Sequence, residues 1–419
     1  MMTLSRQAYG IDISDYSIEL MEIRGHMGRL AVTATARVEL EPGAMSNGLV
    51  QQPDKLIVAL QRLQSSAGLE RRGIRHAILA VPESQMYLYV FTVPAEVQPE
   101  HVGESVQYMA EETLPLSFDQ VYHDYQVLSQ GHDGTDVLYV ACAKPVVDGL
   151  RTVCDRAGIV PVVIEPESAA LARALIPPGP VAPAVLVDIG SRTTIVTIYD
   201  RHGIRYSYTL AVAGNAFTDA LMRGRSMSRE EAERIKRERL VTVSGQPNEL
   251  SEPLDQIVER VSTSISYYEH KTGFAVTHVI LAGGSSLIPG IDQFIGGRLR
   301  LPVSIGKPLQ HVQYERSLFP DEKRSVLYAT VTGLALRGAG HHRIQEGLNL
   351  LRHETAHRQL AVGHWFHRGT QHATSLARPE VRSASHRLNA PLNRMQLLLL
   401  VFGFLIVVFV AVLIIRPNG

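Results

Sequence analysis

The sequence predicts an α/β protein built from two similar lobes, and three features of the chain support this. Residues 8–340 alternate strand-like and helix-like stretches, which is typical of mixed α/β architectures. A short acidic hairpin occurs twice, about 176 positions apart, which indicates two related lobes that face each other across a cleft. An uncharged apolar run at 395–415 stands apart from this pattern and predicts a separate C-terminal helix.

Both hairpins follow one plan: a strand, an aspartate, a spacer, a small residue, a turn and a second strand. The first begins YGIDIS at residue 9, and the second begins VLVDIG at residue 185. Turn amides can form an anion-binding nest, and small residues let the backbone approach a phosphate chain. Because Mg²⁺ prefers oxygen ligands and keeps much of its water, Asp12 and Asp188 are candidates for holding it. A turn-forming role is the alternative for either aspartate alone.

A third motif, VILAGGSSLIPG at 279–290, places two glycines directly after a strand. The missing side chains leave a flat slot in which a planar base could lie, although a structural turn is the alternative for this stretch alone. No GxxxxGK[ST] pattern occurs in the sequence, so a Walker-type phosphate loop is excluded.

The remaining segments complete the predicted architecture. Strand-like stretches at 78–82, 88–93 and 137–143, with helical stretches at 102–112 and 146–157, predict a small α+β insertion at about 77–160. Ser228 and Glu231 form a capping-box pattern that opens a charged helix running to about residue 240. Apolar residues at helical spacing predict a further helix at 253–271.

These motifs resemble those of the actin-like ATPase superfamily and, within it, the PilM family of type IV pilus assembly. The similarity covers about residues 8–338, through GIDISDYSIELMEI, VDIGSRTTI, GNAFTDALMRGRSMSREEAERIKRE, LAGGSSLIPGI and YATVTGLALRG. The resemblance implies a ribonuclease H-like fold of two lobes with the insertion at 77–160. The first lobe would comprise 8–76 and 161–180, completed by about 322–340, and the second 181–321.

The resemblance also implies ATP and Mg²⁺ in the cleft. It assigns Asp12, Glu165 and Asp188 to the catalytic centre, with Asp12 and Asp188 as metal ligands and Glu165 ordering metal-bound water. The residues implied in nucleotide binding are Ser14, Ser17, Gly190, Ser191, Arg192, Thr193, Thr194, Gly214, Glu233, Lys236, Gly283, Gly284 and Ser285. For Glu233 and Lys236, a solvated ion pair on one helix is the alternative.

Three positions depart from the family pattern. Ser14 stands where glycine is usual, Glu19 where lysine is usual, and Ala213 where a glycine pair is common. Ser14 adds bulk beside the phosphates. If Glu19 faces the nucleotide, its charge should weaken binding; if it faces solvent, little changes. We therefore expect ATP binding with slow or no hydrolysis.

Composition and the C-terminal run predict the location of the chain. The 41 basic and 41 acidic residues cancel, so no net charge attracts nucleic acid. The two cysteines suit a reducing compartment, and the N-terminus lacks the apolar core of a signal peptide. Residues 395–415 are long enough to span a bilayer, at about 1.5 Å per residue, with a buried core helix as the alternative.

The charges beside the apolar run predict its orientation. Eight arginines and three acidic residues lie in 341–394, which places the large N-terminal part in the cytoplasm and the protein in the inner membrane as a single-pass protein. Residues 341–394 predict a flexible linker. A histidine metal site there, for instance His364 with His367, is an unfavoured alternative because no acidic or cysteine partner lies nearby.

The resemblance implies a nucleotide-dependent scaffold of the pilus inner-membrane platform. Residues 347–352, GLNLLR, resemble the Asn-Leu-Leu peptide by which PilN proteins dock on PilM, with a plain linker as the alternative. The expected partners are therefore a PilN-like membrane protein or the chain's own Asn349 motif, other pilus platform and motor proteins, the membrane, and a second copy. Alternative functions are an FtsA-like division protein, an actin-like part of a type II secretion platform, or a small-molecule kinase, which would need another acidic base.

Overall fold

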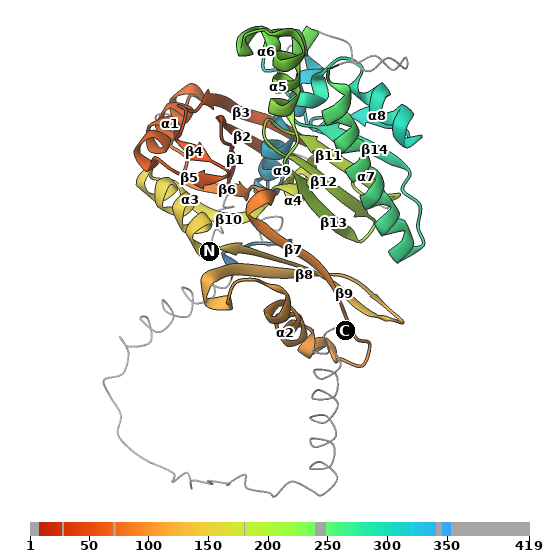
Figure 1. The fold of residues 1–419 in the computed structure, drawn as a ribbon. Coiled ribbons are helices and arrows are strands. Elements are labelled where there is room, and N and C mark those ends of the chain that lie inside the picture. Colours follow the sequence, from red (N-terminus) through yellow and green to blue (C-terminus); the bar gives the residue numbers. More distant parts are fainter. Residues whose placement is uncertain are drawn as a thin grey trace, which may run out of the picture. The chain divides into compact units, whose positions relative to one another are not determined.

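Two five-stranded sheets with the same strand order form the framework of the protein (Figure 1). The computed structural model describes residues 8–26, 29–69, 73–179, 181–238, 249–319, 321–340 and 346–352. The chain divides into two compact units, residues 1–361 and 362–419, and the second unit lies outside the described residues. All elements below belong to the first unit.

The first sheet has the order β10-β6-β1-β2-β3 and is covered on both faces. Its strands are β1 (Tyr9–Ile13), β2 (Ser17–His26), β3 (Arg29–Glu39), β6 (His76–Val81) and β10 (Val160–Pro166). The helices on one face are α1 (Pro53–Ser66) and α3 (Lys144–Arg156), and those on the other are α4 (Glu167–Leu175) and α9 (Ala329–Gly338). Strand β6 is parallel to β1, and its continuous apolar run suits a strand buried on both faces.

The second sheet has the order β13-β12-β11-β14-β15, and its strands correspond in turn to β3, β2, β1, β6 and β10 of the first sheet. This correspondence agrees with the predicted pair of similar lobes. Its strands are β11 (Ala184–Ile189), β12 (Thr194–Asp200), β13 (Gly203–Leu210), β14 (His278–Ala282) and β15 (Val303–Ile305). One face shares a core with α5 (Gly214–Arg225), α6 (Arg229–Glu238), α7 (Ser251–Thr272) and α8 (Ile291–Leu299). The other face packs on α4, so α4 and α9 lie between the two sheets (Figure 1).

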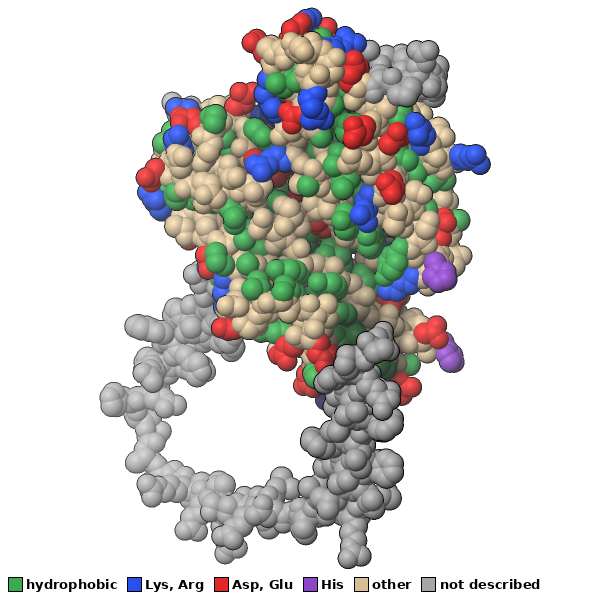
Figure 2. All heavy atoms as spheres, in the orientation of Figure 1, with side chains coloured by type: hydrophobic (Ala, Val, Ile, Leu, Met, Phe, Trp, Pro, Cys, Tyr) green, Lys and Arg blue, Asp and Glu red, His purple; other side chains and the backbone are tan. Residues whose placement is uncertain are grey.

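A small α+β unit is inserted between β6 and α3. It consists of β7 (Met86–Val93), α2 (Val102–Thr113), β8 (Val121–Gly131) and β9 (Gly134–Ala143), with the sheet order β7-β9-β8. The unit is narrower than the predicted block 77–160, because β6 pairs with β1 in the first sheet and α3 joins the core of that lobe. Figure 2 shows hydrophobic side chains gathered over this small sheet, whereas acidic and basic side chains are interspersed over α5 and α6.

Glycine residues let α9 approach its neighbours at backbone distance. A Cβ atom at Gly333 of α9 would overlap the carbonyl group of Ala170 on α4. On the sheet side, the backbone nitrogen of Ala335 lies 2.6 Å from the position that a Cβ atom of Gly10 would take. Helix α9 is therefore held close to both β1 and α4.

A tight hairpin lies between β3 and α1 and joins β4 (Met45–Ser46) to β5 (Leu49–Val50). Its two turn residues, Asn47 and Gly48, have φ angles of 52° and 73°. A two-residue type I′ turn requires positive φ at both positions, and Asn-Gly is the sequence that adopts it most readily. The turn holds Asn47 at the edge of the inter-lobe cleft described below.

The two helices predicted from capping and spacing are present. The amide of Glu231 donates to Ser228 Oγ at 3.2 Å at the start of α6, and the predicted helix 253–271 lies within α7. The predicted membrane helix 395–415, the linker apart from 346–352, and His364 with His367 lie outside the described residues. Within the described ranges, no helix has both the length and the apolar character that crossing a membrane requires.

Both cysteines are buried in the core of the first lobe and are expected to be unreactive. Burial raises the pKa of Cys142 and of Cys154 from 9.0 to about 12. Because the thiolate is the reactive form, a disulfide reagent at pH 8 should modify the native chain at least about 100-fold more slowly than the guanidinium-unfolded chain. Since the unfolded thiols ionise first, this burial also makes the unfolding free energy fall as pH rises above about 9. Equal modification rates would contradict the buried position of both thiols.

Candidate functional site

A cleft of about 1410 Å³ opens between the two lobes, and segments of both lobes line it. Its walls come from the β1–β2 turn, the β11–β12 turn, the turn after β14, helices α5 and α6, and the start of α9. The predicted site residues that line it are Asp12, Ser14, Ser17, Asp188, Gly190, Ser191, Arg192, Thr193, Gly214, Glu233, Lys236, Gly283, Gly284 and Ser285. Glu165 and Thr194 are not among the lining residues.

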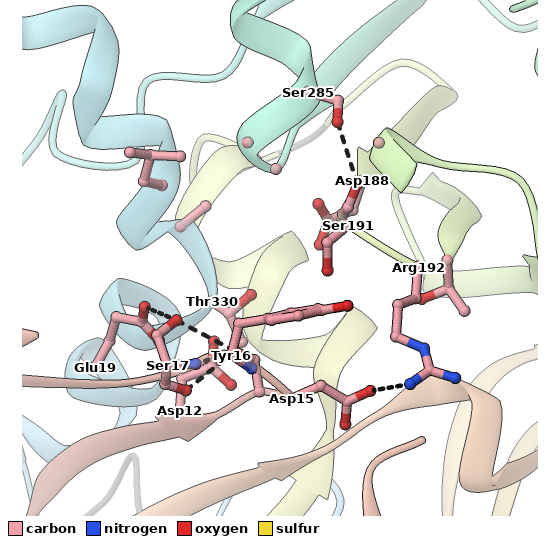
Figure 3. A pocket seen from close by; sticks show the side chains of 18 of the residues that line it. Asp12, Asp15, Tyr16, Ser17, Glu19, Asp188, Ser191, Arg192, Ser285 and Thr330 are labelled. Carbon is pink, nitrogen blue, oxygen red and sulfur yellow. Dashed lines mark hydrogen bonds and ion pairs between the residues drawn. The ribbon is translucent and has the colours of Figure 1, made fainter. Parts of the chain in front are cut away.

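The hydroxyl groups of Ser14 and Ser17 brace the β1–β2 turn. Ser14 Oγ donates to the Ser17 carbonyl at 3.0 Å and accepts from the Ser17 amide at 3.1 Å. The Ser17 hydroxyl in turn donates to Glu19 at 2.7 Å (Figure 3). The turn is therefore ordered by its own side chains before any ligand binds.

Glu19 faces the cleft rather than solvent. It lies opposite Asp12 in the β1–β2 ladder and opposite Arg37 in the β2–β3 ladder. Burial raises the pKa of Glu19, although the charge of Arg37 and the hydrogen bond from Ser17 oppose this effect. Arg37 Nε lies 3.3 Å from the Glu19 carboxylate and Arg37 also lines the cleft, so the negative charge of Glu19 has a cation beside it.

The two neighbouring threonines of the β11–β12 turn have different environments. Thr193 lines the cleft, whereas Thr194 is fully buried and donates from Oγ1 to the Val212 carbonyl at 2.7 Å. The Thr194 side chain is thus held within the second lobe and does not face a ligand in the cleft. The nucleotide-binding role predicted for Thr194 is therefore replaced by a structural one.

Gly190 joins three segments of the second lobe. Its carbonyl accepts hydrogen bonds from the Gly214 amide at 3.0 Å and from the Ser285 hydroxyl at 3.1 Å. A Cβ atom at Gly283 would overlap the carboxylate of Asp188, and Gly283 has a φ angle of +77°, which side-chain-bearing residues rarely adopt. Glycine at 283 therefore leaves Asp188 open to the cleft.

Helix α6 supplies the pair Glu233 and Lys236. Lys236 Nζ lies 2.8 Å from Glu233 and also donates to the Gly214 carbonyl at 3.1 Å and to Thr218 at 2.9 Å. The Lys236 side chain is only 11% exposed, and burial lowers its pKa. A solvated ion pair, the alternative considered from the sequence, does not describe this arrangement.

Among the carboxylates that line the cleft, we call Asp12, Glu167 and Asp188 the acidic floor. Burial raises the pKa of Asp188 to about 6 and the pKa values of Asp12 and Glu167 well above the ordinary range. Repulsion from neighbouring carboxylates adds to this effect at Asp12 and Glu167. Destabilised carboxylate anions favour a nearby cation, so the acidic floor fits Mg²⁺.

The donor set on the acidic floor matches the coordination habit of Mg²⁺. In the part of the chain that the structure describes, no group of three or more His, Cys, Asp or Glu side chains is arranged to hold a metal by itself. Mg²⁺ commonly takes one or two carboxylates and keeps several waters beside substrate phosphates. Asp12 and Asp188, one from each lobe, fit that mode.

Glu165 does not lie in the cleft, contrary to the prediction. It is fully buried at the end of β10, where Arg173 donates to both carboxylate oxygens at 2.7 and 2.8 Å and Arg337 forms a second ion pair. Burial alone would raise the pKa of Glu165, but the two arginines outweigh it and hold the pKa below its ordinary value. The chain changes from strand to helix after Pro166, and Glu167 becomes the cleft residue.

A second site holds residues 346–352 against β10. Asn349 Oδ1 accepts from the Ile164 amide at 3.2 Å, and its Nδ2 donates to the Val162 carbonyl at 3.3 Å. The Leu350 amide also donates to the Ile164 carbonyl at 2.9 Å. Leu348, Leu350 and Leu351 are buried in the core of the first lobe. The segment is therefore docked on its own chain, and the plain-linker alternative is wrong for these residues.

Two buried charged side chains receive the polar groups of this docked segment. Asp124, 2% exposed, accepts from the Asn349 amide at 2.7 Å and pairs with Arg352 at 2.9 Å. Arg337, 1% exposed, donates to the Leu348 carbonyl at 2.6 Å. Buried charges need such partners, so the first lobe and the insertion unit together form a built receptor for the segment.

Sequence reasoning missed Glu167, Asp124 and Arg337. The spacing of Glu165 and Glu167 was a usable signal, because either carboxylate of this Glu-Pro-Glu run could reach the cleft. Asp124 meets Asn349 across 225 positions, and no local pattern marks that contact.

Comparison with known proteins gives a family match over most of the chain. A family model described as type IV pilus assembly protein PilM matches residues 10–339. A solved structure of a PilM-PilN type IV pilus biogenesis complex superposes with a TM-score of 0.68 at 22% identity, covering 80% of this chain and 98% of that one. That likeness shows a shared fold.

Two curated relatives match shorter stretches. The ethanolamine utilization protein EutJ of Escherichia coli (strain K12) is 31% identical over 110 residues, which are 26% of this chain and 36% of EutJ. The cell shape-determining protein MreB of Pasteurella multocida (strain Pm70) is 26% identical over 180 residues, covering 34% of this chain and 51% of MreB. The chain thus spans about a third to a half of the length of these relatives.

Proposed function

Because the chain belongs to the family of the type IV pilus assembly protein PilM, we propose that it is an ATP-binding, membrane-anchored scaffold of the pilus inner-membrane platform. The family match makes it a PilM-type actin-like protein of the type IV pilus assembly system. In this proposal, Mg²⁺ and ATP bind between the two lobes with slow or no hydrolysis. ATP would bridge the lobes and so stabilise one closure of the cleft.

The observation that carries the proposal is the meeting of two acidic turns from different lobes in one cleft. Asp12 and Asp188 line the same cleft, and the charge of Asp188 adds to burial and to the charge of Glu19 in raising the pKa of Asp12. They come from equivalent positions of two sheets with the same strand order, at the ends of β1 and β11. A ligand with strong negative charge and a divalent cation would satisfy both turns and the acidic floor together.

Each part of the cleft has a role in this proposal. Asp12 and Asp188 would hold Mg²⁺, which would offset the charge of the triphosphate. The turn amides that are not bonded within their own turn, with Ser14 and Ser191 beside them, would receive phosphate oxygens. Gly283 and Gly284 leave room for the base, while the Glu233–Lys236 pair braces the α5–α6 wall beside it.

The β1–β2 turn supports slow turnover. Ser14 fills space beside the expected phosphate position and is fixed by its bonds to Ser17. Glu19 brings an additional carboxylate to the same end of the cleft, where Arg37 offsets it only in part because burial still raises the pKa of Glu19. Because Glu19 faces the cleft, its charge should weaken ATP binding and oppose the build-up of negative charge during phosphate cleavage, whereas Ser14 adds only bulk.

The C-terminal part of the chain would provide the anchor. The docked segment resembles the PilN peptide, and the matching solved structure is a PilM-PilN complex. The uncharged run 395–415 then follows in the same sequence, so one chain would combine the PilM unit, its docking peptide and a membrane span. The family match favours this pilus role over an FtsA-like division protein, a type II secretion component or a kinase.

Replacing Asp188 by asparagine is expected to weaken Mg²⁺–ATP binding about 10- to 100-fold, since a charge-assisted contact contributes about 1.5–3 kcal/mol. Calorimetry on the full chain in detergent measures this change. Asp133→Asn, at a fully exposed hairpin tip of the insertion unit, is the matched control and should bind as the wild type does. Unchanged affinity in Asp188→Asn, or no ATP binding by the wild type, would refute the proposed site.

A further inference from the structure

Three side-chain contacts join the two lobes at the opening of the cleft, and we call them the tie: Arg192 with Asp15, Arg192 with Asn47, and Asn215 with Tyr16. Arg192 Nη1, in the β11–β12 turn of the second lobe, lies 3.2 Å from Asp15 Oδ2 in the β1–β2 turn of the first (Figure 3). Arg192 Nη2 also donates to Asn47 Oδ1. Asn215 at the start of α5 donates to the Tyr16 hydroxyl at 3.3 Å. Each contact joins one lobe to the other.

The first-lobe side of this tie is preorganised. The two carboxylate oxygens of Asp15 accept hydrogen bonds from the amides of Asn47 and Gly48, both at 3.0 Å. The type I′ turn of the β4–β5 hairpin fixes those amides, so Asp15 and Asn47 form one rigid acceptor for a guanidinium group. The Asp15 side chain is 12% exposed and that of Arg192 is 39% exposed, so solvent screens the ion pair from the arginine side only.

All the residues of the tie line the cleft that holds the acidic floor. Figure 3 shows the ring of Tyr16 extending from the first-lobe turn toward Ser191 of the second lobe. The charge of Arg192 is already paired with Asp15, so it is committed to the opposite lobe rather than to the interior of the cleft. Tyr16 is 49% exposed and the Arg192 side chain is 39% exposed, so these contacts lie where the cleft meets solvent, and a ligand leaving past them must pass or break the tie.

We propose that Arg192 closes the mouth of the cleft by joining the lobes, and so acts as a positioning residue that slows nucleotide release rather than as a phosphate ligand. The kinetic part rests on the proposed nucleotide site, whereas lobe closure does not. Loss of the tie should therefore increase the dissociation rate of the nucleotide and loosen the ligand-free lobes.

Dissociation of a fluorescent methylanthraniloyl-ATP with Mg²⁺, chased by unlabelled ATP, tests the proposal on the full chain in detergent. Arg192→Gln and Asp15→Asn should each raise the dissociation rate roughly two- to fivefold, as loss of one partly exposed ion pair implies. The double variant should be no faster than either single one, because the two residues act as a unit. Arg192→Lys, which keeps the charge, should fall between Arg192→Gln and the wild type.

A matched control is Arg298→Gln, which breaks the ion pair of Arg298 with Asp255 (3.0 Å), neither of which lines the cleft. It should leave the dissociation rate unchanged. If Arg192 instead binds phosphate, Asp15→Asn frees the Arg192 guanidinium and slows nucleotide release, whereas Arg192→Gln speeds nucleotide release. Opposite effects of these two variants, or no effect of either, would overturn the proposal.

A second measurement needs no nucleotide. Spin labels at Ser65→Cys on α1 and Gln293→Cys on α8 report the distance between the lobes, and both positions are exposed. The native cysteines are buried and should not react with the label. Arg192→Gln should broaden the distance distribution relative to Arg298→Gln. An unchanged distribution would overturn the tie even if ATP binds, and a broadened one would support the tie even if ATP does not bind.

Discussion

Replacing Gly333 by alanine is expected to lower the free energy of unfolding by at least about 3 kcal/mol, at the upper end of overpacking effects. The added methyl group meets the backbone carbonyl of Ala170 on α4, which cannot rotate away as a side chain can. Helices α4 and α9 would have to separate, and both lie between the two sheets. The melting temperature of the full chain in detergent, measured by circular dichroism, checks this result.

Gly333→Ala should also change the shape of the cleft, because Ala329 and Thr330 at the start of α9 line it. Gly149→Ala is the control. Gly149 lies within α3, and its added Cβ would meet only the Val50 side chain at 3.6 Å, an ordinary contact. Alanine is favoured over glycine in helices by up to about 1 kcal/mol, so this variant should melt at or above the wild-type temperature. Equal melting of Gly333→Ala and wild type would contradict the close approach of α4 and α9.

Replacing Asn349 by leucine should release the docked segment. The new side chain has a similar size but leaves the Ile164 amide and the Val162 carbonyl without their Asn349 partners. Each buried polar group left unpaired costs about 1–3 kcal/mol, so the docked state should lose about tenfold or more in population. Limited trypsin digestion followed by mass spectrometry should then show faster cleavage after Arg352.

Two further variants show whether docking itself is measured. Asp124→Asn removes the charge that pairs with Arg352 and should also speed cleavage there. Glu346→Gln changes an exposed residue of the same segment and should cleave like the wild type. Wild-type cleavage in both Asn349→Leu and Asp124→Asn would show that these contacts do not hold the segment.

The two lobes could be predicted because their signals are local. An apolar strand, an aspartate and a tight turn are contiguous in the sequence, and the repeat of this plan at Asp12 and Asp188 predicted two similar lobes. The edge of the insertion unit was harder to predict. The apolar run of β6 suits either a strand of the insertion or a strand of the first sheet, and only its pairing with β1 decides between them.

The segments that line the cleft could be predicted, because each carries a local motif in the sequence. The direction of each side chain was not, because neighbouring residues diverge: Thr193 faces the cleft while Thr194 is buried, and Glu167 faces it while Glu165 pairs with arginines. The same limit applies to Arg192. Its place in the turn was evident, but its bond to Asp15 depends on how the two lobes meet.

The docked segment 346–352 and the receptor formed by the first lobe and the insertion unit belong to the same chain, so they are made in equal amounts. Helix α9 ends at Gly338, and only the seven residues 339–345 separate it from Glu346, the first described residue of the segment. Such a short tether gives an effective local concentration on the order of millimolar. A free peptide with the same sequence would have to exceed that level to displace it. Every molecule therefore carries its own ligand in one-to-one supply, whatever the relative synthesis of other components of the assembly.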